Sequence, residues 1–109
     1  NKHLVRALCA AALALSAGPA LSQAWPSKPV RLVVPFAPGG STDVQARLLA
    51  QELQKSLGQN VIVENRPGAN GNLGTAEVAR APADGYTVLM GGIGPNAVSA
   101  AFTPPPKYD

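Results

Sequence analysis

The stretch at residues 30–43 constrains the fold of this chain more than any other part. Residues 30–34 are mostly apolar, which is typical of a strand buried on both faces, and Pro35 ends that strand because it cannot donate a ladder hydrogen bond. Gly39 and Gly40 then allow a sharp turn. Three side chains suited to capping a helix follow: Ser41, Thr42 and Asp43. The pattern predicts a strand, a glycine turn and a helix N-terminus, where first-turn N–H groups can receive an anion.

The remainder of the chain alternates strand and helix in the same way. Apolar residues recur at mostly four-residue steps up to Leu57, which predicts a helix that starts at Thr42 or Asp43 and stops at Gly58. The further predicted elements are a strand at 61–63 that ends at residues 64–65, a helix at about 73–81, a strand at 86–90 and a helix start at 97–102.

This alternation predicts an α/β fold with a parallel sheet, because parallel strands need crossover helices between them. The apolar character of residues 30–34 predicts that this strand lies at the centre of the sheet. In an open parallel sheet, the turns after the strands collect at the carboxyl edge, where such folds bind ligands. We therefore expect the turns at 36–43, 65–72 and 91–96 to form one ligand edge.

Residues 1–24 are typical of an export signal. A short basic start is followed by an apolar run at 7–17, and Ser22 and Ala24 fit a small-x-small cleavage site. The run is shorter than the roughly 20 residues of a spanning helix, so no stable membrane insertion is expected after cleavage. The expected location is the periplasm, with residues 25–109 as the mature part.

Cleavage after Ala24 would remove both the only cysteine, Cys9, and the only histidine, His3. The commonest general base and the thiolate nucleophile would then be absent. The acidic residues are scattered without a catalytic pair or metal spacing, and Ser41 is not preceded by the Gly-Lys of a phosphate-binding loop. The sequence therefore predicts no enzyme, no metal and no cofactor. A small nucleotide- or phosphate-binding enzyme domain stays open as an alternative.

The charge pattern disfavours nucleic acid as a partner. Cleavage would remove two of the nine basic residues, Lys2 and Arg6, and leave seven against six acidic ones. The remaining basic residues are spread thinly, whereas a nucleic-acid surface needs clustered Lys and Arg.

Three ordered segments resemble the Bug family of periplasmic solute-binding receptors, which serve tripartite tricarboxylate transporters. They are WPSKPVRLVVPFAPGGSTD at 25–43, LGQNVIVENRPGANGNLG at 57–74 and ADGYT at 83–87. The resemblance implies a two-domain, type II periplasmic binding protein whose cleft takes a small carboxylate and passes it to membrane transporter subunits. Residues 25–109 would form part of the first domain, and the second domain is absent from this sequence.

The resemblance also implies which residues contact the carboxylate, through backbone groups, hydroxyls and bridging waters. Carried over to this sequence, the ligand-binding residues are Phe36, Ala37, Pro38, Gly39, Gly40, Ser41, Thr42, Gly92, Gly94 and Asn96. No catalytic residue and no metal ligand is implied.

Several residues keep a second interpretation. Asp43 is expected to favour the helix dipole rather than to contact a ligand amine, and Ser41 can cap a helix, donate to a ligand, or both. Asn65 is expected to be a turn or cap residue. Arg66 is expected to be solvated or to bridge Glu64 rather than to pair with a ligand. The chain can also be read as a non-functional fragment, for which weak stability and little ligand affinity are expected.

Overall fold

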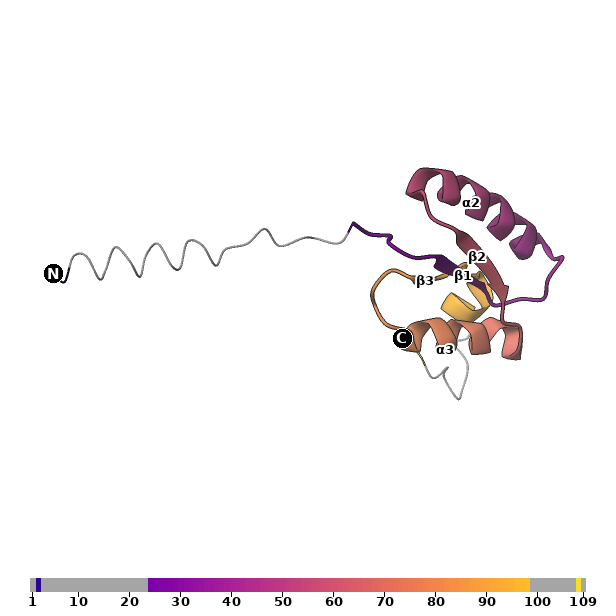
Figure 1. The fold of residues 1–109 in the computed structure, drawn as a ribbon. Helices are drawn as coiled ribbons and strands as arrows, with labels where there is room; N and C mark the ends of the chain where they lie inside the picture. The colour runs from indigo at the N-terminus through magenta and orange to yellow at the C-terminus, as the bar shows by residue number, and fades with distance from the viewer. Residues whose placement is uncertain (1, 3–23, 99–107, 109) are drawn as a thin grey trace.

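The computed structural model describes Lys2, residues 24–98 and Tyr108. Its elements, in chain order, are β1 (Val30–Val34), α2 (Ser41–Leu57), β2 (Val61–Asn65), the 3-10 turn η1 (Ala69–Gly71), α3 (Asn72–Arg80), β3 (Thr87–Leu89) and the π-helical turn η2 (Gly94–Val98) (Figure 1). The predicted α/β alternation is confirmed. Most of the predicted signal, and residues 99–102 of the helix start predicted at 97–102, lie outside the described residues.

The three strands form one parallel sheet in the order β2-β1-β3. The central position predicted for β1 is confirmed: Val33 and Val34 are fully buried, and Val30 aligns with Val61 of β2. Two further backbone hydrogen bonds extend the sheet at its carboxyl edge, from Arg66 N to Val34 O and from Met90 N to Val33 O, both 2.8 Å. The loops that follow β2 and β3 are therefore fixed to β1.

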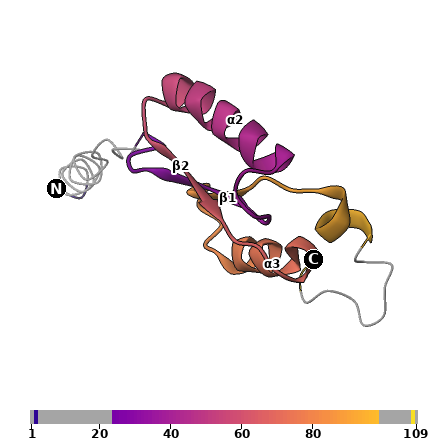
Figure 2. The same cartoon turned by 90° about the vertical axis from the view of Figure 1, so that its right-hand side faces the viewer.

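The two long helices cover opposite faces of the sheet (Figures 1 and 2). Helix α2 packs on β1 and β2, and α3 packs on β1 and β3. The core on the α2 side consists of buried apolar residues: Val30, Leu32, Val34, Ala46, Ala50 and Val61. The small side chains at Ala46 and Ala50, one helical turn apart, allow α2 to approach the strands closely. Within the described part of the chain, no helix is long and apolar enough to cross a bilayer.

The start of α2 differs from the predicted start. The N-cap is Gly40, with extended backbone at φ −77° and ψ 171°, and no side chain caps it. Ser41 and Thr42 lie inside the first turn, so the prediction that they cap the helix is wrong. The predicted stop is confirmed, because Gly58 adopts the left-handed conformation (φ 66°) and its N–H donates to Gln54 O.

Helix α3 approaches the end of β1 through Gly74. A Cβ atom at Gly74 would lie 2.7 Å from the carbonyl oxygen of Arg66 and 2.9 Å from Cβ of Pro35. Both distances are too short for carbon, so only glycine fits at this position. The contact holds the N-terminal half of α3 beside the carboxyl edge of the sheet.

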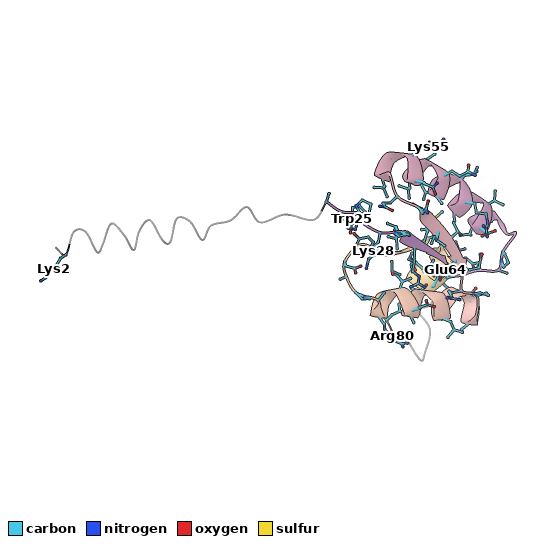
Figure 3. All side chains as sticks on the ribbon, viewed as in Figure 1. Lys2, Trp25, Lys28, Lys55, Glu64 and Arg80 are labelled. Atoms are coloured by element: carbon cyan, nitrogen blue, oxygen red, sulfur yellow. The ribbon has the colours of Figure 1, made fainter. Side chains whose placement is uncertain are left out.

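A closed ring of four charged side chains lies on the α3 side. Arg31 of β1 pairs with Glu64 of β2 (2.8 Å) and Glu77 of α3 (3.0 Å), and Arg66 pairs with the same two carboxylates at 3.1 and 3.2 Å. Glu64 is labelled in Figure 3. Hydrogen bonds from Arg31 lower the pKa of Glu64, and those to Glu64 and then Glu77 raise that of Arg31. The bridge from Arg66 to Glu64, expected from the sequence, is confirmed.

The segment before β1 packs on Tyr86. Ser27 N donates to the Tyr86 hydroxyl at 2.9 Å, the Trp25 ring centroid lies 6.0 Å from that of Tyr86, and Lys28 Nζ lies 4.5 Å from the centroid of the same ring. Trp25 and Lys28 are labelled together in Figure 3. Residues 25–28 are therefore part of the fold and lie at the opposite end of the sheet from the ligand edge.

Candidate ligand-binding loops

Three loops meet at the carboxyl edge of the sheet, as the sequence predicts. They are defined here as the first loop (residues 36–40), the second loop (66–71) and the third loop (90–95). The ring of Phe36 lies between the others: a Cβ on Gly71 of the second loop would lie 3.2 Å from it, and one on Gly92 of the third loop 3.1 Å. Figure 2 shows the starts of α2 and α3 together with η2 at this end of the sheet.

The first loop presents main-chain donors at the start of α2. Gly39 is left-handed (φ 86°), and a Cβ there would meet nothing within 4 Å. The first intrahelical bond runs from Val44 N to Gly40 O (3.0 Å), so the N–H groups of the preceding first-turn residues have no partner inside the helix. Ser41 is exposed and Thr42 is half-buried. The loop thus combines exposed backbone, a helix N-terminus and two hydroxyl groups.

The carboxylate of Asp43 bonds the main chain of this loop. Its side chain is 5% exposed. Oδ2 accepts from Gly39 N at 2.9 Å and from Arg47 Nε at 3.0 Å, and Oδ1 accepts from Asn65 Nδ2 at 3.0 Å. These donors, Arg47 first, lower the pKa of Asp43 to about 2. Asp43 is a first-turn acid as expected, but its carboxylate bonds Arg47 on its own helix, Gly39 in the loop and Asn65 at the end of β2.

Asn65 does not play the turn or cap role expected from the sequence. It is the last residue of β2, and its Nδ2 group donates to Phe36 O at 3.1 Å as well as to Asp43. Arg47 Nη2 donates to Asn65 Oδ1 at 3.3 Å. One sequence signal could have indicated this cluster: the four-residue spacing of Asp43 and Arg47, which places both on one helix face.

The predicted ligand residues Gly92, Gly94 and Asn96 lie in three different surroundings. Gly92 packs against Phe36, and a Cβ at Gly94 would lie 3.2 Å from Asn70 Nδ2. Asn96 N donates to Gly92 O at 3.2 Å, but the Asn96 side chain lines a separate pocket. The structure therefore brings Gly92 beside the first loop, Gly94 beside the second, and Asn96 beside neither.

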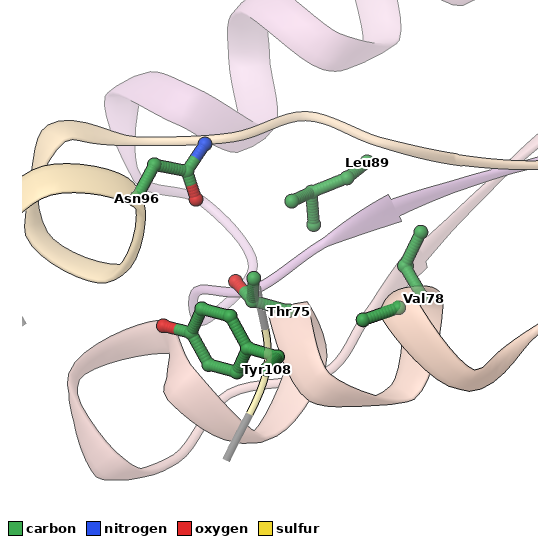
Figure 4. Close-up of a pocket in the computed structure, with 6 residues that line it drawn as sticks. Thr75, Val78, Leu89, Asn96 and Tyr108 are labelled. Carbon is green, nitrogen blue, oxygen red and sulfur yellow. The ribbon is translucent and has the colours of Figure 1, made fainter. Parts of the chain in front are cut away.

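That separate pocket encloses about 270 Å³ between α3, β3 and η2 (Figure 4). Its lining consists of Thr75, Val78, Ala79, Leu89, Asn96 and Tyr108. None of these side chains is charged, and the Thr75 hydroxyl already donates to Gly71 O at 2.9 Å. Only Asn96 belongs to the predicted ligand set. The pocket offers little to an anion, in contrast to the start of α2.

The chemistry available at the first loop is binding by neutral donors. Arg47 donates to Asp43 and Asn65, and Arg66 pairs with Glu64 and Glu77. Among the residues that the structure describes, no group of His, Cys, Asp or Glu has the arrangement of a metal site. The loop can hold an anion through N–H and O–H groups without a formal ion pair.

Comparison with known proteins identifies the family. The sequence model described as "Tripartite tricarboxylate transporter family receptor" matches residues 45–105. Protein BugT of Bordetella pertussis is 48% identical over 93 residues, which cover 84% of this chain and 28% of that protein. A UPF0065 protein of Bordetella bronchiseptica is 48% identical over 97 residues, which cover 89% of this chain and 29% of that protein.

Solved structures agree with the sequence comparison. MatC (Rpa3494) from Rhodopseudomonas palustris with bound malate is 43% identical, with a TM-score of 0.73 over 77% of this chain and 29% of that one. The periplasmic binding protein BugD is 54% identical, and R. palustris Rpa4515 with adipate is 49% identical; each has a TM-score of 0.58 over 60% of this chain and 22% of the other. The described α/β unit is thus a portion of a periplasmic binding protein fold.

The chain spans less than a third of the length of these relatives. Two of the solved relatives are described by their function: BugD as a periplasmic binding protein, and a TctC protein from Polaromonas, 46% identical with a TM-score of 0.57 over 60% of this chain and 23% of that one, as a solute binding protein. The family model covers more than half of the chain, and the three loops lie at one edge of a parallel sheet that is similar to the solved structures. On these grounds the chain belongs to the receptor family of the tripartite tricarboxylate transporters.

Proposed function

We propose that the protein containing this sequence is a periplasmic receptor that captures a small carboxylate and delivers it to the membrane subunits of a tripartite transporter. The observation that carries this proposal is the exposed N-terminus of α2 beside the left-handed Gly39, in a chain of this receptor family. Two structural relatives contain the dicarboxylates malate and adipate, which supports a small carboxylate as the ligand class.

The proposed contacts on this chain come mainly from the first loop and the start of α2. They are Phe36, Ala37, Pro38, Gly39, Gly40, Ser41 and Thr42, with Gly92 and Gly94 adjoining them. Asn96 stays in the proposed set as a residue that would have to turn away from its pocket. Neutral donors at a helix N-terminus stabilise an anion without an ion pair, so release to the transporter stays fast.

We propose that residues 25–109 form part of the first of two domains, and that residues 1–24 are the export signal. The loops at the carboxyl edge then make one wall of a cleft, and the second domain makes the other. This chain covers less than a third of each relative, which supports the assignment of residues 25–109 to only part of a two-domain protein. The alternative of a nucleotide-binding enzyme gains no support, because the relatives are binding proteins.

The test is calorimetric titration of the purified full-length protein with malate, adipate and citrate. We expect saturable binding of at least one of them. The matched control is 1,6-hexanediol, which has the chain length of adipate without its carboxylates and is expected not to bind. The absence of binding by all three carboxylates, or equal binding of the diol, would contradict the proposal.

A further inference from the structure

We propose that Asp43 and Asn65 are positioning residues that hold the first loop in its anion-receiving shape before a ligand arrives. This inference rests on the proposed function, because it assigns the groups that prepare that same site. Neither side chain belongs to the set expected to touch the ligand. Both act through backbone atoms of the loop.

The two residues tie the loop at both ends. Asn65 Nδ2 donates to the carbonyl oxygen of Phe36 (3.1 Å), the first residue of the loop, and Asp43 Oδ2 accepts from the N–H of Gly39 (2.9 Å), next to its last residue. Between these points Ala37 and Pro38 are exposed. The exposed turn that leads into the helix N-terminus is therefore held by two side-chain contacts, one on each side of it.

The ties also fix the loop to the rest of the fold. Asn65 belongs to β2 and Asp43 to α2, and the two side chains bond each other through Nδ2 and Oδ1 at 3.0 Å. The loop geometry is thus set jointly by the sheet and by the helix whose N-terminus it exposes. A loop already ordered in the free protein loses less conformational entropy when a ligand binds, which strengthens binding.

The contacts of Asp43 also reduce the negative charge that a ligand would meet beside the proposed anion site. An acidic residue in the first turn of α2 would repel a carboxylate ligand if it faced outward with its charge uncompensated. Asp43 is instead buried and directed at Gly39 N–H, and Arg47 Nε lies 3.0 Å from its Oδ2. Arg47 offsets the Asp43 charge, and its Nε and Nη2 groups are directed at Asp43 and Asn65.

The donor and acceptor pattern explains why an aspartate is required. Three donors converge on its carboxylate, from Gly39, Arg47 and Asn65. Asparagine has the same shape but replaces one acceptor oxygen by an NH₂ group, which would face a donor. The variant Asp43→Asn therefore breaks at least one of the three bonds while keeping the volume of the side chain.

The experiment compares Asp43→Asn and Asn65→Ala with the control Glu52→Gln. Glu52 lies on the same helix, but its side chain is 71% exposed and, within the part of the chain that the structure describes, it pairs with the exposed Lys55. Two quantities are measured in the full-length protein: the rate of hydrogen exchange of the Gly39 amide without ligand, and the Kd for malate and adipate. We expect both variants to speed Gly39 exchange at least tenfold and to raise the Kd at least tenfold, and the control to change each less than twofold.

Two results would overturn the inference. One is unchanged Gly39 exchange in the folded variants. The other is a lower melting temperature with an unchanged Kd for the folded protein, which is the signature of a merely structural role. If Asp43→Asn does not fold, Asn65→Ser is measured in its place, because it leaves the bonds from Gly39 and Arg47 to Asp43 intact. Failure of the wild-type protein to bind any carboxylate would refute the proposed function, while Gly39 exchange would still decide whether the loop is held.

Discussion

The two long helices start at the same edge of the sheet, each after a left-handed glycine, yet one N-terminus is open and the other is closed. At the start of α2, a Cβ on Gly39 would meet nothing within 4 Å. At the start of α3, a Cβ on Gly71 would lie 3.1 Å from Pro95 Cγ and 3.2 Å from the Phe36 ring. The backbone angles are nearly equal, with φ of 86° and 88°.

The difference lies in what covers each turn. The third loop and the Phe36 ring seal the start of α3, and the Tyr108 hydroxyl lies within hydrogen-bond distance of both Asn72 Oδ1 (2.7 Å) and Pro95 O (2.6 Å). The turn before α2 is instead held by hydrogen bonds to Asp43 and Asn65, and a Cβ at Gly39 meets nothing within 4 Å among the described residues. A glycine turn before a helix is thus an anion site only where neighbouring loops leave it uncovered, which selects α2.

The largest effect is expected at the contact that brings α3 to the edge. Gly74→Ala places a carbon 2.7 Å from Arg66 O and 2.9 Å from Pro35, and neither backbone nor ring can yield easily. We expect the free energy of unfolding to fall by about 3 kcal/mol. Urea unfolding followed by circular dichroism measures it. The control is Ala76→Gly, a change on the same helix that should cost about 1 kcal/mol through helix propensity. A Gly74→Ala loss no greater than that of the control would refute the close contact.

The paired variants Gly71→Ala and Gly39→Ala test the comparison directly. Both place a side chain in the left-handed region, which costs about 1–2 kcal/mol. Only Gly71→Ala also meets Phe36 and Pro95, so we expect it to lose roughly 1 kcal/mol more than Gly39→Ala. The same unfolding experiment serves for both. Equal losses would show that the two turns are equally open and would remove the reason to prefer α2.

Low pH should weaken the hydrogen bonds by which Asp43 holds the first loop. The pKa of Asp43 is about 2 in the folded chain, below the ordinary value near 3.8. A carboxyl with a lowered folded pKa stabilises the fold fully above its unfolded pKa and loses that contribution as the pH falls through its folded pKa. As the pH is lowered from about 4 to about 2, we expect the midpoint temperature of thermal unfolding to fall more steeply for the wild type than for Asp43→Asn. Parallel pH profiles of the two proteins would contradict this.

The sequence predicted the elements whose signals are local. The central place of β1 followed from the mostly apolar character of residues 30–34, and the stop of α2 from Gly58. The meeting of three loops at one edge followed from strand–helix alternation alone. Some element ends were less well predicted: the strand predicted at 86–90 is shorter in the structure, where β3 spans Thr87–Leu89.

The support of the site was not predicted, because it depends on contacts between distant residues. Asp43 and Asn65 are 22 positions apart, and only the register of β1 and β2, which pairs Val34 with Asn65, brings the amide beneath the first loop. The covering of Gly71 by Phe36 and Pro95 depends in the same way on the third loop. The predicted N-cap was wrong for a related reason: the Asp43 carboxylate reaches back to Gly39, and Gly40 takes the cap position.

The smallest effect is expected at the ring of charges on the α3 side. Glu77→Gln removes one carboxylate from the pairs with Arg31 and Arg66, all of which are between a quarter and a half exposed. Water screens such pairs, so we expect a loss of about 0.5–1 kcal/mol in the free energy of unfolding. The loss should shrink in 1 M salt, where the screening length is about 3 Å. Glu52→Gln, at a more exposed pair, is the control and should change stability by less.

Because the ring of charges lies on the opposite side of the sheet from α2, Glu77→Gln should leave the hydrogen exchange rate of the Gly39 amide unchanged. Faster exchange would show that the two helix starts are coupled.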